Sequence, residues 1–145
     1  MNPGILLLIH AAATWFMTGL IWLVQVVHYP LLARVGAAGY REYQLAHQSL
    51  ITLIVGPAML IELAAALLLL FQRRDAWTLA GVALLAVIWI STALFQIPLH
   101  NALSAGFDPA VHARLVHTNW IRTIAWTVRG VLALYLLRAT WHLQN

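Results

Sequence analysis

Two arginines lie on one side of the last long apolar stretch of the chain, residues 111–141. Asn119 and Arg122 are three residues apart and Arg129 follows seven residues later, so all three share one face of a helix. Trp126 falls on the same face. An unpaired arginine deep inside a lipid bilayer costs at least about 2.5 kcal/mol. We therefore expect both guanidinium groups to point into a protein interior and to face a partner there.

Most of the histidines fall near one end of the apolar stretches. If each stretch is followed in its direction of travel, five of the seven histidines lie at the end opposite the chain termini. They are His28, His47, His100, His112 and His117. Other polar residues recur at helical spacing on the same stretches, among them Gln25, Thr92 and Gln96. Because polar side chains of membrane bundles face the interior, we expect a polar site at this end.

Three of these histidines come from different apolar stretches and are candidate ligands for a metal ion or a haem. The metal candidates are His28, His47 and His100. Imidazoles at one depth can bind iron or copper, and Arg122 can neutralise haem propionates. The same imidazoles can instead act as acid and base while Asn119 and Arg122 hold a polarised oxygen of a substrate. Histidines at helix ends also sit at membrane interfaces without further function, which is our interpretation of His112 and His142.

Glu62 is the only acidic residue inside an apolar stretch, and we expect Arg129 and His10 at about the same depth. Each charge would be unpaired in a medium of low dielectric constant, so we predict a buried ion pair between Glu62 and Arg129. A carboxylate inside a membrane can alternatively carry protons or cations. A proton-coupled transporter that uses Glu62 is therefore an open alternative.

The composition is that of an integral membrane protein. Hydrophobic residues make up 63% of the chain, charged residues make up 8%, and the mean hydropathy is +0.84. The net charge of +4 comes from arginines spread along the chain, which fits lipid headgroups and internal pairing better than nucleic acid. The absence of cysteine excludes disulfides, thiolate metal sites and thiol nucleophiles. The sequence has no phosphate-binding glycine loop and no pair of catalytic carboxylates.

The pattern predicts one all-α domain, residues 1–145, that forms an integral membrane four-helix bundle. Each apolar span is long enough to cross about 30 Å of hydrocarbon at about 1.5 Å per residue. The predicted spans are residues 5–33, 46–71, 77–100 and 111–141. The connections are short, and the first is predicted at residues 34–44, so we expect an up-down-up-down arrangement. Pro57 should bend the second helix, and Asp108 should cap the fourth.

The seven tryptophans divide into two groups by position. Those near span ends are typical of the aromatic belt at a membrane surface. They are Trp77, Trp120 and Trp141. Those within spans follow the polar positions and would line an aromatic pocket, with ordinary interior packing as the alternative. They are Trp15, Trp22, Trp89 and Trp126.

Two short motifs lie on either side of the last loop. They are Pro98-Leu99-His100-Asn101-Ala102-Leu103 and Thr118-Asn119-Trp120-Ile121-Arg122-Thr123. They resemble the motifs of a family of small four-helix membrane proteins that includes the anthrone oxygenases of polyketide pathways. In this family asparagine is common where the chain has His100. The resemblance implies oxidation of an aromatic or lipophilic substrate within the membrane, with Asn101, Asn119 and Arg122 at the site.

We therefore expect a membrane-embedded oxidoreductase or oxygenase-like protein that acts on a lipophilic or aromatic substrate. The expected catalytic residues are His100, Asn101, Asn119 and Arg122, and the expected cofactor-binding residues are His28, His47, His100 and Arg122. A transporter and a non-catalytic assembly or ligand-binding subunit are the alternatives. The expected partners are the lipid bilayer and a small lipophilic ligand, without nucleic acid, and a homo-oligomer stays open. We place the protein in a bacterial-type inner membrane with cytoplasmic termini.

Overall fold

The computed structural model describes residues 2–142, with side chains up to residue 140, and this part of the chain is all-helical without strands. Four long helical rods are built from helices that follow one another along the chain. The elements are α1 (Pro3–Leu23), η1 (Val24–His28), α2 (Tyr29–Leu32), α3 (Tyr40–Gln72), α4 (Ala76–Ser91), η2 (Thr92–Gln96), α5 (Ile97–Leu103) and α6 (Pro109–His142). The first rod is α1, η1 and α2, and the third is α4, η2 and α5.

The four rods are each long and apolar enough to cross a membrane. Their bounds are Pro3–Leu32, Tyr40–Gln72, Ala76–Leu103 and Pro109–Thr140. The prediction that residues 34–44 form the first connection is therefore wrong in part, because α3 begins at Tyr40. The Tyr40 ring is buried and packs edge-on against Phe107, with 5.0 Å between ring centroids. This burial extends the helix beyond the apolar run that marked it in the sequence.

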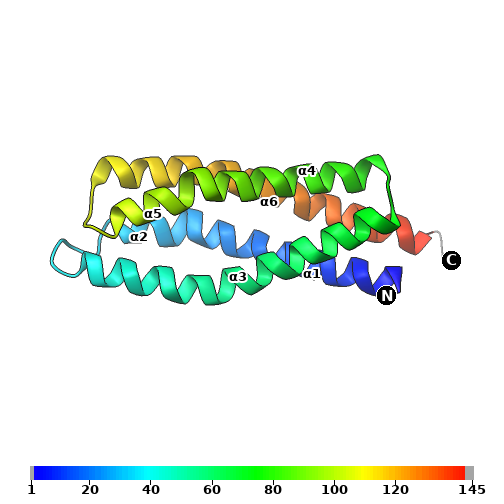
Figure 1. The fold of residues 1–145 in the computed structure, drawn as a ribbon, viewed down its shortest axis with the longest axis horizontal. Coiled ribbons are helices and arrows are strands. Elements are labelled where there is room, and N and C mark those ends of the chain that lie inside the picture. The colour runs from blue at the N-terminus through cyan, green and yellow to red at the C-terminus, as the bar shows by residue number, and fades with distance from the viewer. Residues whose placement is uncertain (1, 143–145) are drawn as a thin grey trace.

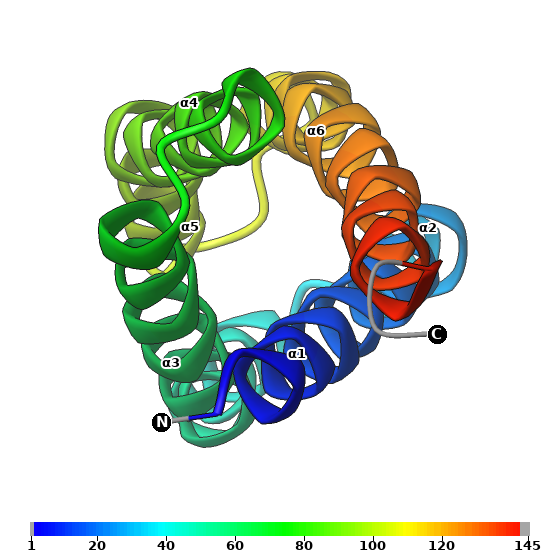
Figure 2. The ribbon, with the colours of Figure 1, turned by 90° about the vertical axis from the view of Figure 1, so that its right-hand side faces the viewer.

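The rods lie side by side around a common axis (Figures 1 and 2). The first rod packs against α3 and α6, and α4 packs against α6 and, less extensively, against α3. The start of α1, the end of α6 and the α3–α4 turn lie at one end of the molecule (Figure 1). The loops 33–39 and 104–108 lie at the other end. The contact between α3 and α5 is the loosest side of the ring.

Side-chain caps start three of the rods. The Asn2 side chain accepts a hydrogen bond from the Gly4 amide at 2.8 Å. Asp75 accepts from the Thr78 amide at 2.8 Å, and Asp108 accepts from the amides of Ala110 and Val111 at 2.8 and 3.0 Å. These bonds satisfy amide groups that a helix leaves unpaired at its first turn. The predicted role of Asp108 as a helix cap is therefore confirmed.

Two prolines explain the π-helical turns in the first and third rods. Pro30 and Pro98 have no amide hydrogen, so neither can continue the regular α-helical pattern. One residue earlier, the amide of Tyr29 bonds to the carbonyl of Val24, five residues back, and the amide of Ile97 bonds to Thr92 in the same way. A π-turn holds one residue more than an α-helical turn, so the side chains that follow it face a different direction around the helix. Each π-turn buries a glutamine: Gln25 and Gln96.

Pro57 has a different effect, because α3 remains one helix through it. The ribbon of α3 bends near its middle, in the region of this proline (Figure 1). The C-terminal half of α3 lies closer to the third rod than the N-terminal half does (Figure 1).

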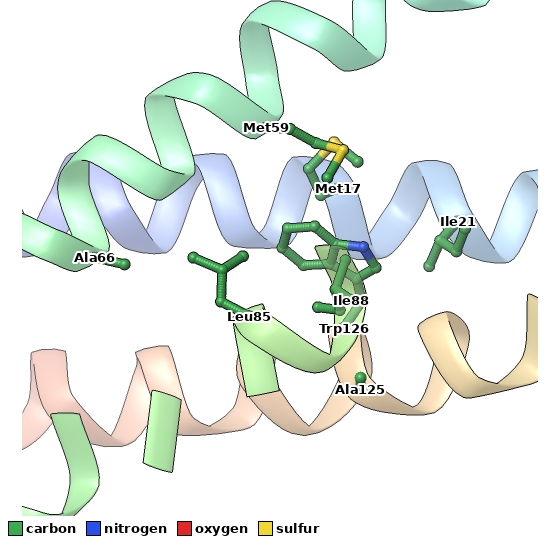
Figure 3. Packing of buried hydrophobic residues seen from close by; sticks show 8 residues of the cluster. All are labelled: Met17, Ile21, Met59, Ala66, Leu85, Ile88, Ala125 and Trp126. Carbon is green, nitrogen blue, oxygen red and sulfur yellow. The ribbon is translucent and has the colours of Figure 1, made fainter. Parts of the chain in front are cut away.

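The central apolar core separates the two ends of the bundle. It is made of Met17, Ile21, Met59, Ala66, Leu85, Ile88, Ala125 and Trp126. In Figure 3 the side chains of Met17 and Met59 meet beside the indole ring of Trp126. Trp126 and Ile88 have no exposed surface. Most of the core residues come between two groups of polar side chains, one that includes Arg122 and one that includes Glu62 and Arg129, and these groups form two separate layers.

Candidate functional site

A pocket of about 550 Å³ lies inside the bundle on the loop side of the central core, and residues of all four rods line it. Its wall is mostly apolar, and the polar side chains are gathered on part of it. The apolar wall residues are Met17, Leu20, Ile21, Val24, Ile51, Val55, Met59, Leu60 and Ile97. The polar wall residues include Tyr29, His47, Gln48, Gln96, His100, Asn101 and Arg122. Such a mixture suits a ligand with a lipophilic body and one polar group.

The pocket opens through the loose side of the ring. Four residues that line it are also exposed at the outer surface, namely Thr52, Leu60, Ile97 and Asn101. All four belong to α3 or α5. Leu60 and Ile97 are 59% and 54% exposed, so the rim of the opening is partly apolar. A ligand can reach the pocket sideways, from the surface that the rods present outward.

A chain of hydrogen bonds fixes the protonation of His100. The Gln44 amide nitrogen lies 2.9 Å from His100 Nδ1 and 3.3 Å from the His100 carbonyl oxygen, so it faces two acceptors. Nδ1 therefore accepts, and the proton sits on Nε2, which lies 3.1 Å from the Tyr29 hydroxyl. That hydroxyl donates to Gln96 Oε1 at 3.1 Å, and Gln96 Nε2 donates to Thr118. His100 is thus a neutral imidazole with both nitrogens engaged.

His28 and His47 form a stack beside His100. The centroids of the His28 and His47 rings are 4.1 Å apart with 26° between their planes, and the His47 and His100 centroids are 5.6 Å apart. Metal bonds to imidazole lie in the ring plane, so two stacked rings do not direct lone pairs to one point. No group of three or more histidine, aspartate or glutamate side chains among residues 2–140 is placed to hold a metal ion.

The structure thus brings His28, His47 and His100 together without arranging them as ligands, and the metal and haem interpretations gain no support from it. His47 is the histidine of the three that remains available in the pocket. Within the described chain its ring nitrogens make no hydrogen bond, and its side chain lines the pocket wall. An imidazole in this state can accept a proton from a bound molecule.

Arg122 lies at the pocket wall and is 7% exposed. Its Nη1 donates to Asn119 Oδ1 at 3.1 Å, and Asn119 in turn donates to Gln25 Oε1 at 2.8 Å. The Arg122 Nε is buried and has no partner in the described chain. Asn119 is fully buried behind Arg122 and does not line the pocket. The predicted pair is therefore adjacent, with Asn119 orienting the arginine and only Arg122 facing a ligand.

Glu62, Arg129 and His10 meet on the other side of the central core. The carboxylate of Glu62 contacts Arg129 Nη2, accepts a hydrogen bond from Thr14 at 2.8 Å and lies 3.4 Å from His10 Nε2. Arg129 also donates to the carbonyl of Gly81. Glu62 has no exposed surface, and Arg129 is 1% exposed. The ion pair that we predicted is thus present and lies outside the pocket.

Several side chains that we expected inside the bundle point elsewhere. His117, Trp15 and Trp22 are exposed, so the expectation that they join the interior polar group is wrong. Trp126 packs in the core, which leaves Trp89 as the pocket tryptophan among the four. His112 bonds through Nε2 to the Tyr29 carbonyl at 2.8 Å, which gives it a role inside the bundle. The remaining interface candidate, His142, lies outside the described side chains.

Two polar residues near the pocket depend on the early start of α3, and the sequence pattern does not single them out. Gln44 falls within the predicted first connection, and Gln48 follows that connection closely. In the structure Gln44 bonds to the His100 ring, and Gln48 donates to the His100 carbonyl. Tyr29 enters the pocket through the π-turn. The proline directly after Tyr29 is the available signal, because a proline within an apolar helix displaces the register of the turn before it.

Comparison with known proteins does not assign the chain to a family. No family model, curated protein or solved structure matches this chain. The resemblance to anthrone oxygenases therefore stays a prediction, and a function for the chain has to be inferred from the pocket.

Proposed function

We propose that the chain is an integral membrane protein of one domain that crosses the bilayer four times in an up-down-up-down arrangement. Four apolar rods with outward-facing leucine, isoleucine and phenylalanine side chains support this proposal. The short connections and the position of the rod ends in Figure 1 support the alternation. Both termini then lie on one side of the membrane, which we assign to the cytoplasm of a bacterial-type cell.

Within this framework we infer an oxidoreductase that oxidises a lipophilic aromatic substrate with dioxygen. The observation that carries the proposal is a pocket that opens sideways through a partly apolar rim and ends at an available imidazole, His47. Lipophilic substrates and dioxygen both dissolve in the hydrocarbon that would surround this opening. Asn101 lies at the rim and Arg122 at the inner wall, where each can bond to an oxygen of the substrate.

The proposed reaction is that of an activated methylene group between aromatic rings, as in an anthrone. His47 takes one proton from the methylene carbon, and Arg122 stabilises the negative charge that moves onto the carbonyl oxygen. The substrate carbanion then reduces dioxygen. One CH₂ group and one O₂ give one C=O group and one H₂O, so the substrate is oxidised by four electrons and the oxygen is fully reduced.

Oxygen consumption by protein in neutral lipid nanodiscs tests this proposal. With an anthrone as substrate, we expect uptake of one O₂ per quinone formed, above the rate with empty nanodiscs. His47→Ala should lower the rate by about 100-fold or more, as expected for loss of a general base. His117→Ala is the matched control, because this histidine is exposed on α6. No uptake above the empty nanodiscs, or an unchanged rate in His47→Ala, would refute the assignment.

Metal analysis and a visible spectrum of the same sample separate this proposal from the cofactor-dependent alternative. We expect no stoichiometric iron or copper and no visible absorption band. The transporter alternative requires a carboxylate that a ligand can reach, whereas Glu62 pairs with Arg129 on the other side of the central core from the pocket. A non-catalytic ligand-binding subunit would use the same pocket, and it predicts binding of the anthrone without oxygen uptake.

A further inference from the structure

Two arginines on α6 have similar burial but opposite surroundings. Arg129 contacts Glu62, so its charge is neutralised inside the bundle. Arg122 lies about two turns away and is 7% exposed, and no carboxylate of the described chain lies within 4 Å of its nitrogens. Its one hydrogen-bond acceptor is the neutral amide of Asn119. A buried charge without a counter-ion is strongly destabilising.

None of the four acidic side chains lies beside Arg122. The chain has four acidic residues, and each is described by the structure. Glu62 pairs with Arg129, and Asp75 and Asp108 cap α4 and α6. Glu42 is exposed at the start of α3. The four acidic side chains therefore offer Arg122 no counter-ion, while the wall of the pocket gives a ligand direct access to it.

We propose that the pocket takes a monoanionic amphiphile, whose oxygen-centred charge binds Arg122 and whose lipophilic body lies along Val55, Met59 and Leu60. A carboxylate or phenolate on an aromatic or aliphatic body has this chemistry, and so has the acidic headgroup of a phospholipid. The ligand provides the missing counter-ion and replaces the water that would otherwise solvate the guanidinium. This inference rests on the pocket assigned in the proposed function, and it specifies the ionic class of its substrate.

Arg122 is the one arginine or lysine in the described pocket wall, and its neighbours Tyr29 and His100 are engaged with other groups. The hydroxyl proton of Tyr29 is committed to Gln96, and both nitrogens of His100 are engaged. Neither group has a donor hydrogen left for a ligand. Uncharged polar groups remain on His47 and Asn101, and the guanidinium of Arg122 is the charged donor, to which a charged acceptor forms a hydrogen bond roughly twice as strong as one between neutral groups.

The test compares an acid with its uncharged isostere in phosphatidylcholine nanodiscs at neutral pH. The probe is fluorescent 9-anthracenecarboxylate, and its comparison is 9-anthracenecarboxamide, with binding corrected for uptake by empty nanodiscs. We expect the acid to bind at least about tenfold more tightly than the amide. Arg122→Gln should remove this preference, and Arg122→Lys should retain part of it. Arg114→Gln, which removes an exposed arginine of the same helix, should leave the preference unchanged.

Equal affinity of the wild-type protein for acid and amide would overturn the inference, as would a preference that survives in Arg122→Gln. The comparison of the two probes on the wild-type protein stands even if a variant does not fold.

Phosphatidylglycerol nanodiscs distinguish the two sources of the ligand once the preference for the acid has been measured. The affinity of the wild-type protein for the acid is again corrected for uptake by empty nanodiscs of the same lipid. A lower affinity than in phosphatidylcholine identifies a competing lipid headgroup as the occupant, and an unchanged affinity identifies a free acid. Both results support the anion site at Arg122.

Separate outcomes refute the anion site and the proposed oxidation. Acid binding through Arg122 without oxygen uptake would refute the oxidation and leave the anion site standing. Oxidation of a neutral substrate as fast as of an acidic one, with equal affinities, would refute the anion site and leave the oxidation standing.

Discussion

At the scale of single residues, the two buried arginines of α6 differ in the partners that lie within their reach. Glu62 and Arg129 satisfy each other, with Thr14 and His10 completing the surroundings of the carboxylate. Arg122 depends on the pocket instead. Buried charges are tolerated only when a partner, water or a ligand replaces bulk solvent. We therefore propose separate roles for the two arginines, one in stability and one in binding.

The ion pair predicts a stability effect that a double substitution can reverse. Glu62→Gln leaves Arg129 without a counter-ion, and we expect it to destabilise the protein by about 3 to 5 kcal/mol. Removing both charges with Glu62→Gln and Arg129→Gln together should recover part of the loss. Thermal unfolding in detergent measures both effects. Glu42→Gln changes an exposed carboxylate of the same helix and serves as the control, with little change expected; a similar loss there would contradict the pairing argument.

At the scale of elements, the turns and caps decide which side chains reach the pocket. The π-turns before Pro30 and Pro98 bury Gln25 and Gln96, which hold Asn119 and Tyr29. An uninterrupted α-helix would place both glutamines at a different angle around the rod. The pocket extends along α3 on both sides of its internal proline, from His47 to Leu60.

Replacing Pro98 by a residue with a backbone amide hydrogen should therefore weaken ligand binding more than it lowers the stability of the protein. In Pro98→Ala the regular hydrogen-bond pattern can form, because alanine supplies the donor that proline lacks. We expect the affinity for 9-anthracenecarboxylate to fall by about tenfold while the melting temperature stays within a few degrees or rises. Pro109→Ala is the control, since this proline is exposed at the start of α6 and does not line the pocket. Unchanged affinity in Pro98→Ala would show that the π-turn does not position the site.

The cap at the start of α4 predicts a dependence on pH. Burial opposes the charge of Asp75, but hydrogen bonds from Thr78 and the nearby Arg73 outweigh it and hold its pKa below the usual 3.8. A carboxyl whose pKa is lowered on folding stabilises the protein above its unfolded pKa, and this contribution is lost as the pH falls through the folded value. Asp75→Ala should cost about 1 kcal/mol at neutral pH. Melting curves of both proteins should converge below pH 3.8; a difference that stays constant into that acidic range would argue against the cap.

At the scale of the whole molecule, the central core separates the two polar layers of the bundle. The pocket lies on the loop side, and the ion pair lies on the side of the termini. Met17, Met59 and Trp126 close the interior between them (Figure 3). This apolar layer favours a pocket that is entered from the side over a pathway along the axis.

Single cysteines can test the membrane arrangement directly, because the chain has none of its own. Ala37→Cys and Ala105→Cys lie in exposed loops at one end, and Arg74→Cys lies in the turn at the other. In sealed, right-side-out spheroplasts, an impermeant maleimide should label the first two and spare the third until the membrane is opened. The wild-type chain is the unlabelled control. Labelling of all three from outside would contradict a four-span arrangement.

The sequence by itself determined the helical rods, because runs of apolar residues without charge have few other ways to satisfy their backbone. It also determined the Glu62–Arg129 pair, because a single buried carboxylate at the depth of an arginine has one evident partner. Both inferences need only composition and the rise of a helix. The grouping of His28, His47 and His100 at one end followed from the same reasoning.

Only the tertiary structure decided what these groups can do. The angle between imidazole planes, the engagement of both nitrogens of His100 and the absence of a described carboxylate beside Arg122 depend on contacts between distant segments. Gln44 reaches His100 across 56 positions of sequence. Helical spacing fixes which residues share a face of one rod, whereas the rotation of each rod and the π-turns within two of them set which faces meet. The pocket is a product of that packing and has no signature within any single stretch.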